Sequence, residues 1–134
     1  MQFDEFIERV QEQASLETRQ QAETITRSVV ETLGERLDRK VRDGVMAQLP
    51  SELKEFLLAR GMDTDRYVLT EFYNRVGARA GLKYHDAAER AWQVCAVLKG
   101  SITAGELEDI LESLPAEYGE LFGEETPGRA RPKP

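Results

Sequence analysis

The sequence has little of several features that many protein classes require, beginning with cysteine and long apolar runs. Its 134 residues include one cysteine, which excludes an internal disulfide bond and favours a reducing compartment. No apolar stretch approaches the roughly 20 residues that cross a bilayer. The first ten residues, MQFDEFIERV, are acidic and amphipathic, unlike the basic start and short apolar run of a secretory signal. We therefore expect a soluble protein of the cytoplasm with no membrane partner.

The sequence also lacks the residue patterns of familiar catalytic and metal sites. It has one histidine, His85, and one cysteine, Cys95, so these two residue types supply no ligand cluster. It contains no G-x-x-x-x-G-K, G-x-G-x-x-G, G-x-S-x-G or H-E-x-x-H motif. His85 is expected on the surface near a helix start, and Cys95 at a core position where a thiol acts as a small hydrophobe. These features favour a protein without catalytic residues, bound metal or cofactor.

Basic residues are missing from one stretch of the chain. The net charge is −7, and the tail from residue 126 carries the bases Arg129, Arg131 and Lys133. An acidic face repels phosphate, so we expect no nucleic-acid partner, with contact through the basic tail as a weaker alternative. Residues 101–125 hold no base but eight acids: Glu106, Glu108, Asp109, Glu112, Glu117, Glu120, Glu124 and Glu125.

What the sequence does contain is an internal repeat. Residues 5–16 read EFIERVQEQASL and residues 71–82 read EFYNRVGARAGL, an offset of 66. After one single-residue slip the offset is 65, and LPSE at 49–52 returns as LPAE at 114–117. Apolar positions recur at helical spacing in both copies, and no segment alternates with period two. The sequence therefore predicts an all-α fold: two tandem four-helix repeats packed as one domain about a pseudo-twofold axis.

The boundaries follow from the helix signals. Repeat one covers residues 3–60 and repeat two covers 68–122, and together they form one helical domain over residues 1–122. Residues 123–134 contain three prolines and no apolar periodicity, which predicts a disordered tail.

Several positions are expected to begin, end or weaken particular helices. Gly81 should end the first helix of repeat two, and Thr103 should begin the third in a capping box with Glu106. Asp38 is the corresponding cap in repeat one. Gly44 lies inside the helix that follows, at a cost of about 1 kcal/mol relative to alanine. The third helix of repeat one should therefore be the looser of the two.

With the repeated helices and the two LP-x-E corners in view, residues 3–122 resemble a prokaryotic family of duplicated helical proteins, domain of unknown function (DUF) 2267. The resemblance includes GEL at 105–107, LPAEY at 114–118 and ELF at 120–122. The first repeat departs from the family pattern, because DRKVRDG at 38–44 replaces the Gly-Glu turn. The resemblance implies an all-helical fold and supplies no catalytic or binding residue.

Our leading functional hypothesis is a non-enzymatic helical protein-interaction module. The fourth helix of each repeat is short and apolar, and helical docking surfaces are typically read through i, i+3, i+4 anchors. The partner would be another protein or a second copy of the chain. Truncation of Phe122 should then weaken assembly more than folding. The candidate interface residues are Leu53, Phe56, Leu57, Tyr118, Leu121 and Phe122.

The alternative hypothesis is a small-molecule or metal-binding protein with its site between the two repeats. Helix bundles hold such ligands between facing helices. Glu106, Asp109 and Glu112 follow i, i+3, i+6 spacing and would be close enough to gather a divalent cation, although a solvated acidic face is the simpler interpretation.

Two other groups have both a structural and a functional interpretation. Glu5/Arg9 and Glu71/Arg75 are i, i+4 ion pairs, each stabilising a helix by about 0.2–0.5 kcal/mol. The alternative is a twofold-related polar site where the repeats meet. The aromatic side chains are either core residues, the default, or the edge of a ligand cleft: Tyr73, Tyr84 and Trp92.

Overall fold

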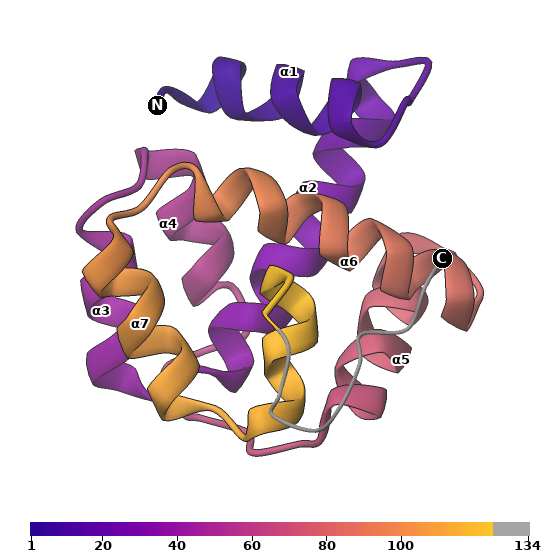
Figure 1. Ribbon diagram of the computed structural model, residues 1–134. Helices are drawn as coiled ribbons and strands as arrows, with labels where there is room; N and C mark the ends of the chain where they lie inside the picture. The colour runs from indigo at the N-terminus through magenta and orange to yellow at the C-terminus, as the bar shows by residue number, and fades with distance from the viewer. Residues whose placement is uncertain (125–134) are drawn as a thin grey trace.

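A computed structural model describes residues 1–124 of the chain (Figure 1). These residues form seven α-helices and one 3₁₀ helix, and no β-strand is found among them. The elements are α1 (Phe3–Gln13), α2 (Arg19–Arg36), α3 (Arg39–Met46), α4 (Ser51–Leu58), α5 (Leu69–Ala80), α6 (Tyr84–Lys99), α7 (Ala104–Ser113) and η1 (Ala116–Phe122). The all-α prediction is confirmed. Most of the predicted tail, including its three basic residues, lies outside the described residues.

The two longest helices, α2 and α6, organise the packing. Helix α2 contacts α1, α4, α5 and α6, while α6 contacts α1, α2, α5 and η1. Helix α3 lies beside α7, and α1 lies across one end of the molecule (Figure 1). The contacts are reciprocal, because α1 packs on α6 in the other half while α5 packs on α2.

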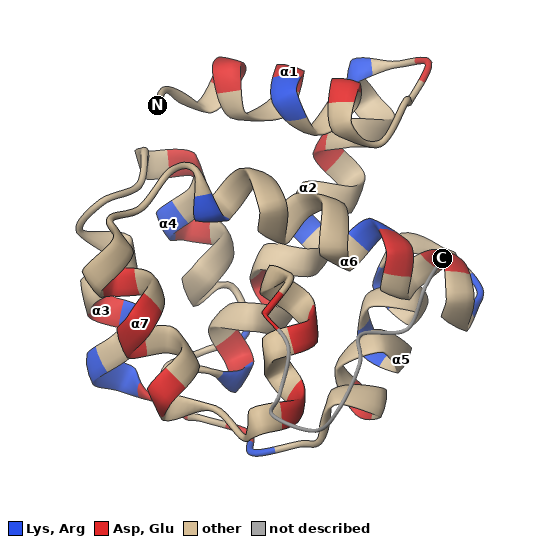
Figure 2. Cartoon of the chain, viewed as in Figure 1, with Lys and Arg blue, Asp and Glu red and all other residues tan. Residues whose placement is uncertain are grey.

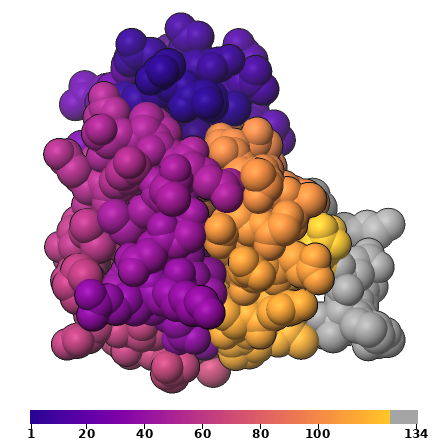
Figure 3. Space-filling view, turned by 90° about the vertical axis from the view of Figure 1, so that its left-hand side faces the viewer, coloured from indigo at the N-terminus to yellow at the C-terminus, as the bar shows by residue number. Residues whose placement is uncertain are grey.

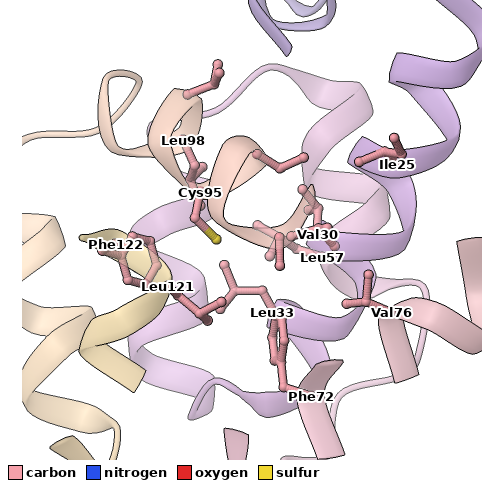
Figure 4. Packing of buried hydrophobic residues seen from close by; sticks show 14 of the residues in the cluster. Ile25, Val30, Leu33, Leu57, Phe72, Val76, Cys95, Leu98, Leu121 and Phe122 are labelled. Carbon is pink, nitrogen blue, oxygen red and sulfur yellow. The ribbon is translucent and has the colours of Figure 1, made fainter. Parts of the chain in front are cut away.

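One cluster of buried hydrophobic residues runs from Phe6 to Phe122. Figure 4 shows Leu57, Leu121 and Cys95 gathered near Leu33 in the interior. Helix α2 contributes Val29, Val30 and Leu33 to this cluster, and α6 contributes the residues at the corresponding repeat positions, Val94, Cys95 and Leu98. The apolar stripes of both halves are therefore buried in one common hydrophobic core.

The last helix, η1, differs from α4 in being a 3₁₀ helix. Gly119 lies in its middle, and glycine is a poor helix former. A Cβ at Gly119 would lie 2.8 Å from the carbonyl oxygen of Glu124, whose own N–H donates to the Gly119 carbonyl at 2.9 Å. The chain therefore folds back tightly over η1, and Glu124 also pairs with Lys99 at 3.0 Å.

The predicted helix ends are partly as expected. Gly81 has φ 72° and ends α5, as predicted. The Thr103 hydroxyl accepts a hydrogen bond from the Glu106 N–H at 3.1 Å. The other half of the capping box comes from Gln48, in the turn that follows α3, whose side-chain oxygen accepts from the Thr103 N–H at 2.8 Å. Thr103 is thus capped partly from the first half of the chain.

The Glu106 carboxylate turns instead toward Gly44. A Cβ at Gly44 would lie 2.7 Å from the nearer carboxylate oxygen of Glu106, so glycine makes room for this side chain between α3 and α7. Asp38 precedes α3 in the N-cap position but forms no side-chain cap, because its carboxylate faces Arg66 at 3.1 Å. Sequence reasoning assigned Gly44 a weakening effect and missed this contact.

The segment between α4 and α5 is held by buried arginines that the sequence did not point out. The Arg42 side chain is fully buried and donates to the carbonyls of Gly34 at 3.1 Å and Met62 at 2.6 Å. Arg36 is 4% exposed and donates to the Tyr67 carbonyl at 2.8 Å. Carbonyl oxygens thus accept from both Nη atoms of Arg42, whereas its buried Nε has no hydrogen-bond partner among the described residues. The segment is therefore fixed to α2 and α3.

Candidate functional site

The residues predicted to form a docking surface lie mostly inside the protein. Five of the six are at most 3% exposed: Leu53, Leu57, Tyr118, Leu121 and Phe122. Phe56 is partly exposed, and its ring packs edge-on against Phe3 with 6.0 Å between ring centroids. Five of the six candidate positions are therefore buried within the chain itself. The physical reason is that the stripe which docks a partner is the same stripe that packs a helix into its own core.

Two of these residues still reach a surface groove between α6 and η1. The groove has a volume of about 360 Å³ and is lined in part by Trp92, Ala96, Lys99, Leu121 and Phe122. This groove is therefore one surface at which predicted interface residues border solvent.

The three predicted aromatic residues form a connected cluster beside this groove. Tyr73 is 2% exposed and therefore a core residue, whereas Tyr84 is 38% exposed. The Trp92 indole N–H donates to the Tyr73 hydroxyl at 2.7 Å, and that hydroxyl donates to the Glu120 carboxylate. Burial and the bond to Glu120 raise the pKa of Tyr73. Trp92 lines the groove, so the cluster is partly core and partly cleft edge.

The surfaces of the first half of the chain, which includes α3, and of the second half, which includes α7, meet along one boundary (Figure 3). Glu106, Asp109 and Glu112 line a groove of about 460 Å³ together with Lys40 and Gly44. Burial, followed by the nearby charge of Asp109, raises the pKa of Glu106. Within residues 1–124 no group of three histidine, cysteine, aspartate or glutamate side chains is placed to hold a metal ion.

His85 and Cys95 occupy the kinds of position expected of them. His85 is exposed, with its ring edge-on to Tyr84 at a centroid distance of 5.8 Å. Cys95 is fully buried, and burial raises the pKa of its thiol to about 12. The thiol is thus protonated at neutral pH, and thiols in this form are poor nucleophiles.

The two predicted ion pairs have different surroundings. Arg9 and Glu5 form an exposed pair at 3.3 Å. Arg75 pairs with Glu71 at 2.9 Å and also with Glu35 of α2 at 3.0 Å. The two pairs are therefore not equivalent, because Arg75 belongs to a cluster between α2 and α5.

Glu35 is the centre of this cluster. Its carboxylate accepts from Arg79 at 3.1 Å and from the Tyr67 hydroxyl at 3.0 Å, besides its contact with Arg75. The Arg75 guanidinium lies 4.1 Å from the centroid of the Tyr67 ring. Burial alone would raise the pKa of Glu35, but the bonds from Arg75, Arg79 and Tyr67 outweigh it and lower the pKa.

This lowered pKa predicts an acid-sensitive contribution to stability. A carboxyl group whose pKa is lower in the folded state stabilises the fold above its ordinary pKa, 4.5, and loses that effect as pH falls through the folded value. We expect the free energy of unfolding to fall with acidification below pH 4.5 more steeply in the wild type than in Glu35→Gln. Denaturant unfolding across this pH range measures the slopes. Glu5→Gln is the control, and equal slopes for wild type and Glu35→Gln would contradict the prediction.

A further pocket lies where the start of α2 meets the end of α5 and the first half of α6. We call it the seam pocket. It has a volume of about 310 Å³ and brings together residues from both halves of the chain. Its lining is Leu16, Thr18, Gln20, Gln21, Thr24, Ile25, Ala80, Leu82 and Arg90. Sequence reasoning placed Leu16 and Leu82 in the repeat but did not identify them as facing one another.

Arg90 is the one charged residue of the seam pocket lining. Its Nη1 donates to the Ala14 carbonyl at 3.1 Å and to the Gln93 side-chain oxygen at 3.0 Å. In the described part of the chain no carboxylate lies within 4.0 Å of its guanidinium nitrogens. This differs from Arg75 and Arg79, both of which pair with Glu35.

Comparison with known proteins places the chain in a family. No curated protein matches the chain. Residues 3–121 match the family described as uncharacterized conserved protein (DUF2267), as the repeated helices and LP-x-E corners led us to expect. No helix within residues 1–124 has the length and apolarity needed to cross a bilayer. The match extends over most of the sequence, and the chain therefore belongs to the DUF2267 family.

Proposed function

We propose that this protein is a small-molecule binding protein and that the seam pocket is its site. The observation that carries the proposal is the lining, in which the partly exposed apolar residues Leu16, Ala80 and Leu82 meet a single arginine. Small-molecule sites are typically concave and apolar, with a few polar groups that fix orientation. A volume of about 310 Å³ is at the lower end of the usual range, which favours a compact ligand.

The position of the seam pocket supports a functional role for the internal duplication. We propose that the halves are related by a pseudo-twofold axis close to this pocket. In the repeat, Leu16 corresponds to Leu82, and Ile25 corresponds to Arg90. All four residues line the pocket. The reciprocal contacts of α1 with α6 and of α5 with α2 agree with such an arrangement, and so does the left-handed backbone at both Ser15 and Gly81.

Filling the pocket tests the proposal. Ala80→Phe places a ring in the pocket, whereas Ala78→Phe places the same ring at an exposed position of the same helix. With 1-hexanol as the probe, we expect saturable shifts of the backbone amide signals around Leu16 and Leu82 in the wild type. These shifts should be lost in Ala80→Phe and kept in Ala78→Phe.

Two results would contradict this proposal. One is a set of shifts that spreads evenly over the surface without saturating. The other is identical 1-hexanol binding by Ala80→Phe and the wild type, with native amide spectra for both.

A protein-interaction role is the second candidate, because two of the predicted interface residues, Leu121 and Phe122, line the groove between α6 and η1. Trp92, Lys99 and Phe122 lie in its lining. Acidic residues lie along α7 and η1 (Figure 2), and complementary charge favours a basic partner surface. The partner would be another protein or a second copy of the chain.

A further inference from the structure

We propose that the ligand of the seam pocket is a small amphipathic carboxylate, bound through Arg90 and covered on its apolar side by Leu16, Ile25 and Leu82. This inference rests on the proposed binding function and adds the chemical class of the ligand. It follows from the charge of the pocket, the mixed polarity of its lining, and its size.

The charge of the lining favours an anion. Arg90 is the only charged side chain in the lining, and no carboxylate of the described residues neutralises it. Both of its hydrogen bonds use Nη1, which leaves Nε and Nη2 as donors. A guanidinium group presents paired donors that match the two oxygens of a carboxylate. Arg90 thus has guanidinium donors available for a ligand carboxylate, whereas Arg75 and Arg79 each pair with the Glu35 carboxylate.

The first turn of α2 contributes a second positive field at the same pocket. Gln20 and Gln21 of this turn line it, as does Thr18 immediately before. The Thr18 hydroxyl accepts from the Gln21 N–H at 3.1 Å, and the Gln21 side chain accepts from the Thr18 N–H at 3.1 Å. This capping box fixes the turn. The amino-terminal end of a helix carries a partial positive charge, so it reinforces the preference for an anion.

The duplication gives the pocket a lining in which equivalent repeat positions differ in polarity. Leu16 and Leu82 are equivalent repeat positions and both are partly exposed. Ile25, which is 6% exposed, has Arg90 as its repeat counterpart. One half therefore supplies a hydrophobic side chain where the other supplies a cation. A molecule with an apolar body and one carboxylate should therefore bind more tightly than a neutral molecule with the same apolar body.

The test compares hexanoate with 1-hexanol and hexylammonium, which share the same apolar chain. Affinities are measured by amide chemical-shift titration of the full chain. We expect the wild type to bind hexanoate about tenfold more tightly than 1-hexanol, since a hydrogen bond to a charged group has this order of effect. Hexylammonium should bind more weakly than either.

Variants assign the preference to Arg90. Arg90→Gln should lose about tenfold in hexanoate affinity and leave 1-hexanol affinity unchanged. Lys83→Gln removes the same charge outside the pocket and should bind hexanoate as the wild type does. Arg90→Lys keeps the charge without the paired donors, so its hexanoate affinity should lie between those of the wild type and Arg90→Gln. This variant still tests the role of Arg90 if Arg90→Gln does not fold.

The outcomes separate this inference from the function on which it rests. Binding of 1-hexanol in the pocket with no preference for hexanoate overturns the ligand class and leaves the binding function intact. An undiminished hexanoate affinity in Arg90→Gln overturns the role of Arg90. Failure of both probes to shift the pocket signals overturns both proposals.

Discussion

Replacing Gly34 with alanine should lower the free energy of unfolding by about 3 kcal/mol, the upper part of the usual range for overpacking. The same change inside an exposed helix normally stabilises a protein, because glycine is the poorer helix former. At Gly34, however, a Cβ would lie 2.1 Å from the carbonyl oxygen of Leu57 and 2.7 Å from its Cα. These are backbone atoms, so α2 and α4 would have to move apart. The Gly34 carbonyl also accepts from Arg42, and that bond would be disturbed too.

Thermal unfolding measures this effect, and a loss of about 3 kcal/mol corresponds to a fall in Tm of roughly 10 °C for a domain of this size. Gly105→Ala is the matched control. Gly105 lies in α7, where an added Cβ meets no atom within 4 Å, so alanine should raise the stability by about 0.5–1 kcal/mol. A Gly34→Ala variant that melts at or above the wild-type temperature would contradict the close approach of α2 and α4.

Truncation of Phe122 to alanine should also be strongly destabilising, by about 3 kcal/mol or more. Phe122 is 3% exposed and belongs to the core cluster. Removing a buried ring loses its transfer free energy and leaves a cavity. The sequence-based hypothesis made the opposite prediction, namely that assembly would weaken more than folding.

Urea unfolding and light scattering together decide between these two expectations. Phe56→Ala serves as the comparison, because Phe56 is the partly exposed member of the same predicted surface. Its loss of stability should be the smaller of the two. If Phe122→Ala keeps the wild-type unfolding midpoint and changes only the assembly state, the burial of Phe122 in the core is contradicted.

The helices were predictable because the signals for them are local. The spacing of Val29, Val30 and Leu33 repeats at 3.6 residues, and the same stripe returns in the second half. Gly81 marks a helix end through its own backbone preference. Such signals can be recognised without knowing which other helix packs against the segment.

The packing partners of the apolar stripes could not be predicted from local signals. The apolar residues of α4 and η1 have the same pattern whether they meet a partner or α2 and α6, so their burial had to be seen in the structure. Arg42 was missed for a related reason. Arginine is rarely fully buried, and no local sequence pattern identifies the carbonyls of Gly34 and Met62 as its acceptors.

The seam pocket also depends on contacts between distant segments. The repeat identifies Leu16 with Leu82, and Ile25 with Arg90, but equivalence in a repeat does not imply contact. Packing of α2 on α5 and α6 brings these positions to one cavity. The sequence did contain one signal for this site. The repeat position that is Ile25 in the first copy is Arg90 in the second, and such a change from an apolar to a charged residue suggests a role other than packing.

The most direct test of the binding proposal is native mass spectrometry of the full chain, gently isolated from the cells that make it, for the wild type, Ala80→Phe and Ala78→Phe. Recovery of the chain as a dimer or with another polypeptide would favour the groove between α6 and η1 instead. The seam-pocket account predicts a monomer that carries one small organic adduct in the wild type and in Ala78→Phe, and no adduct in Ala80→Phe. A bare chain in all three samples, or the same adduct on Ala80→Phe, would contradict it.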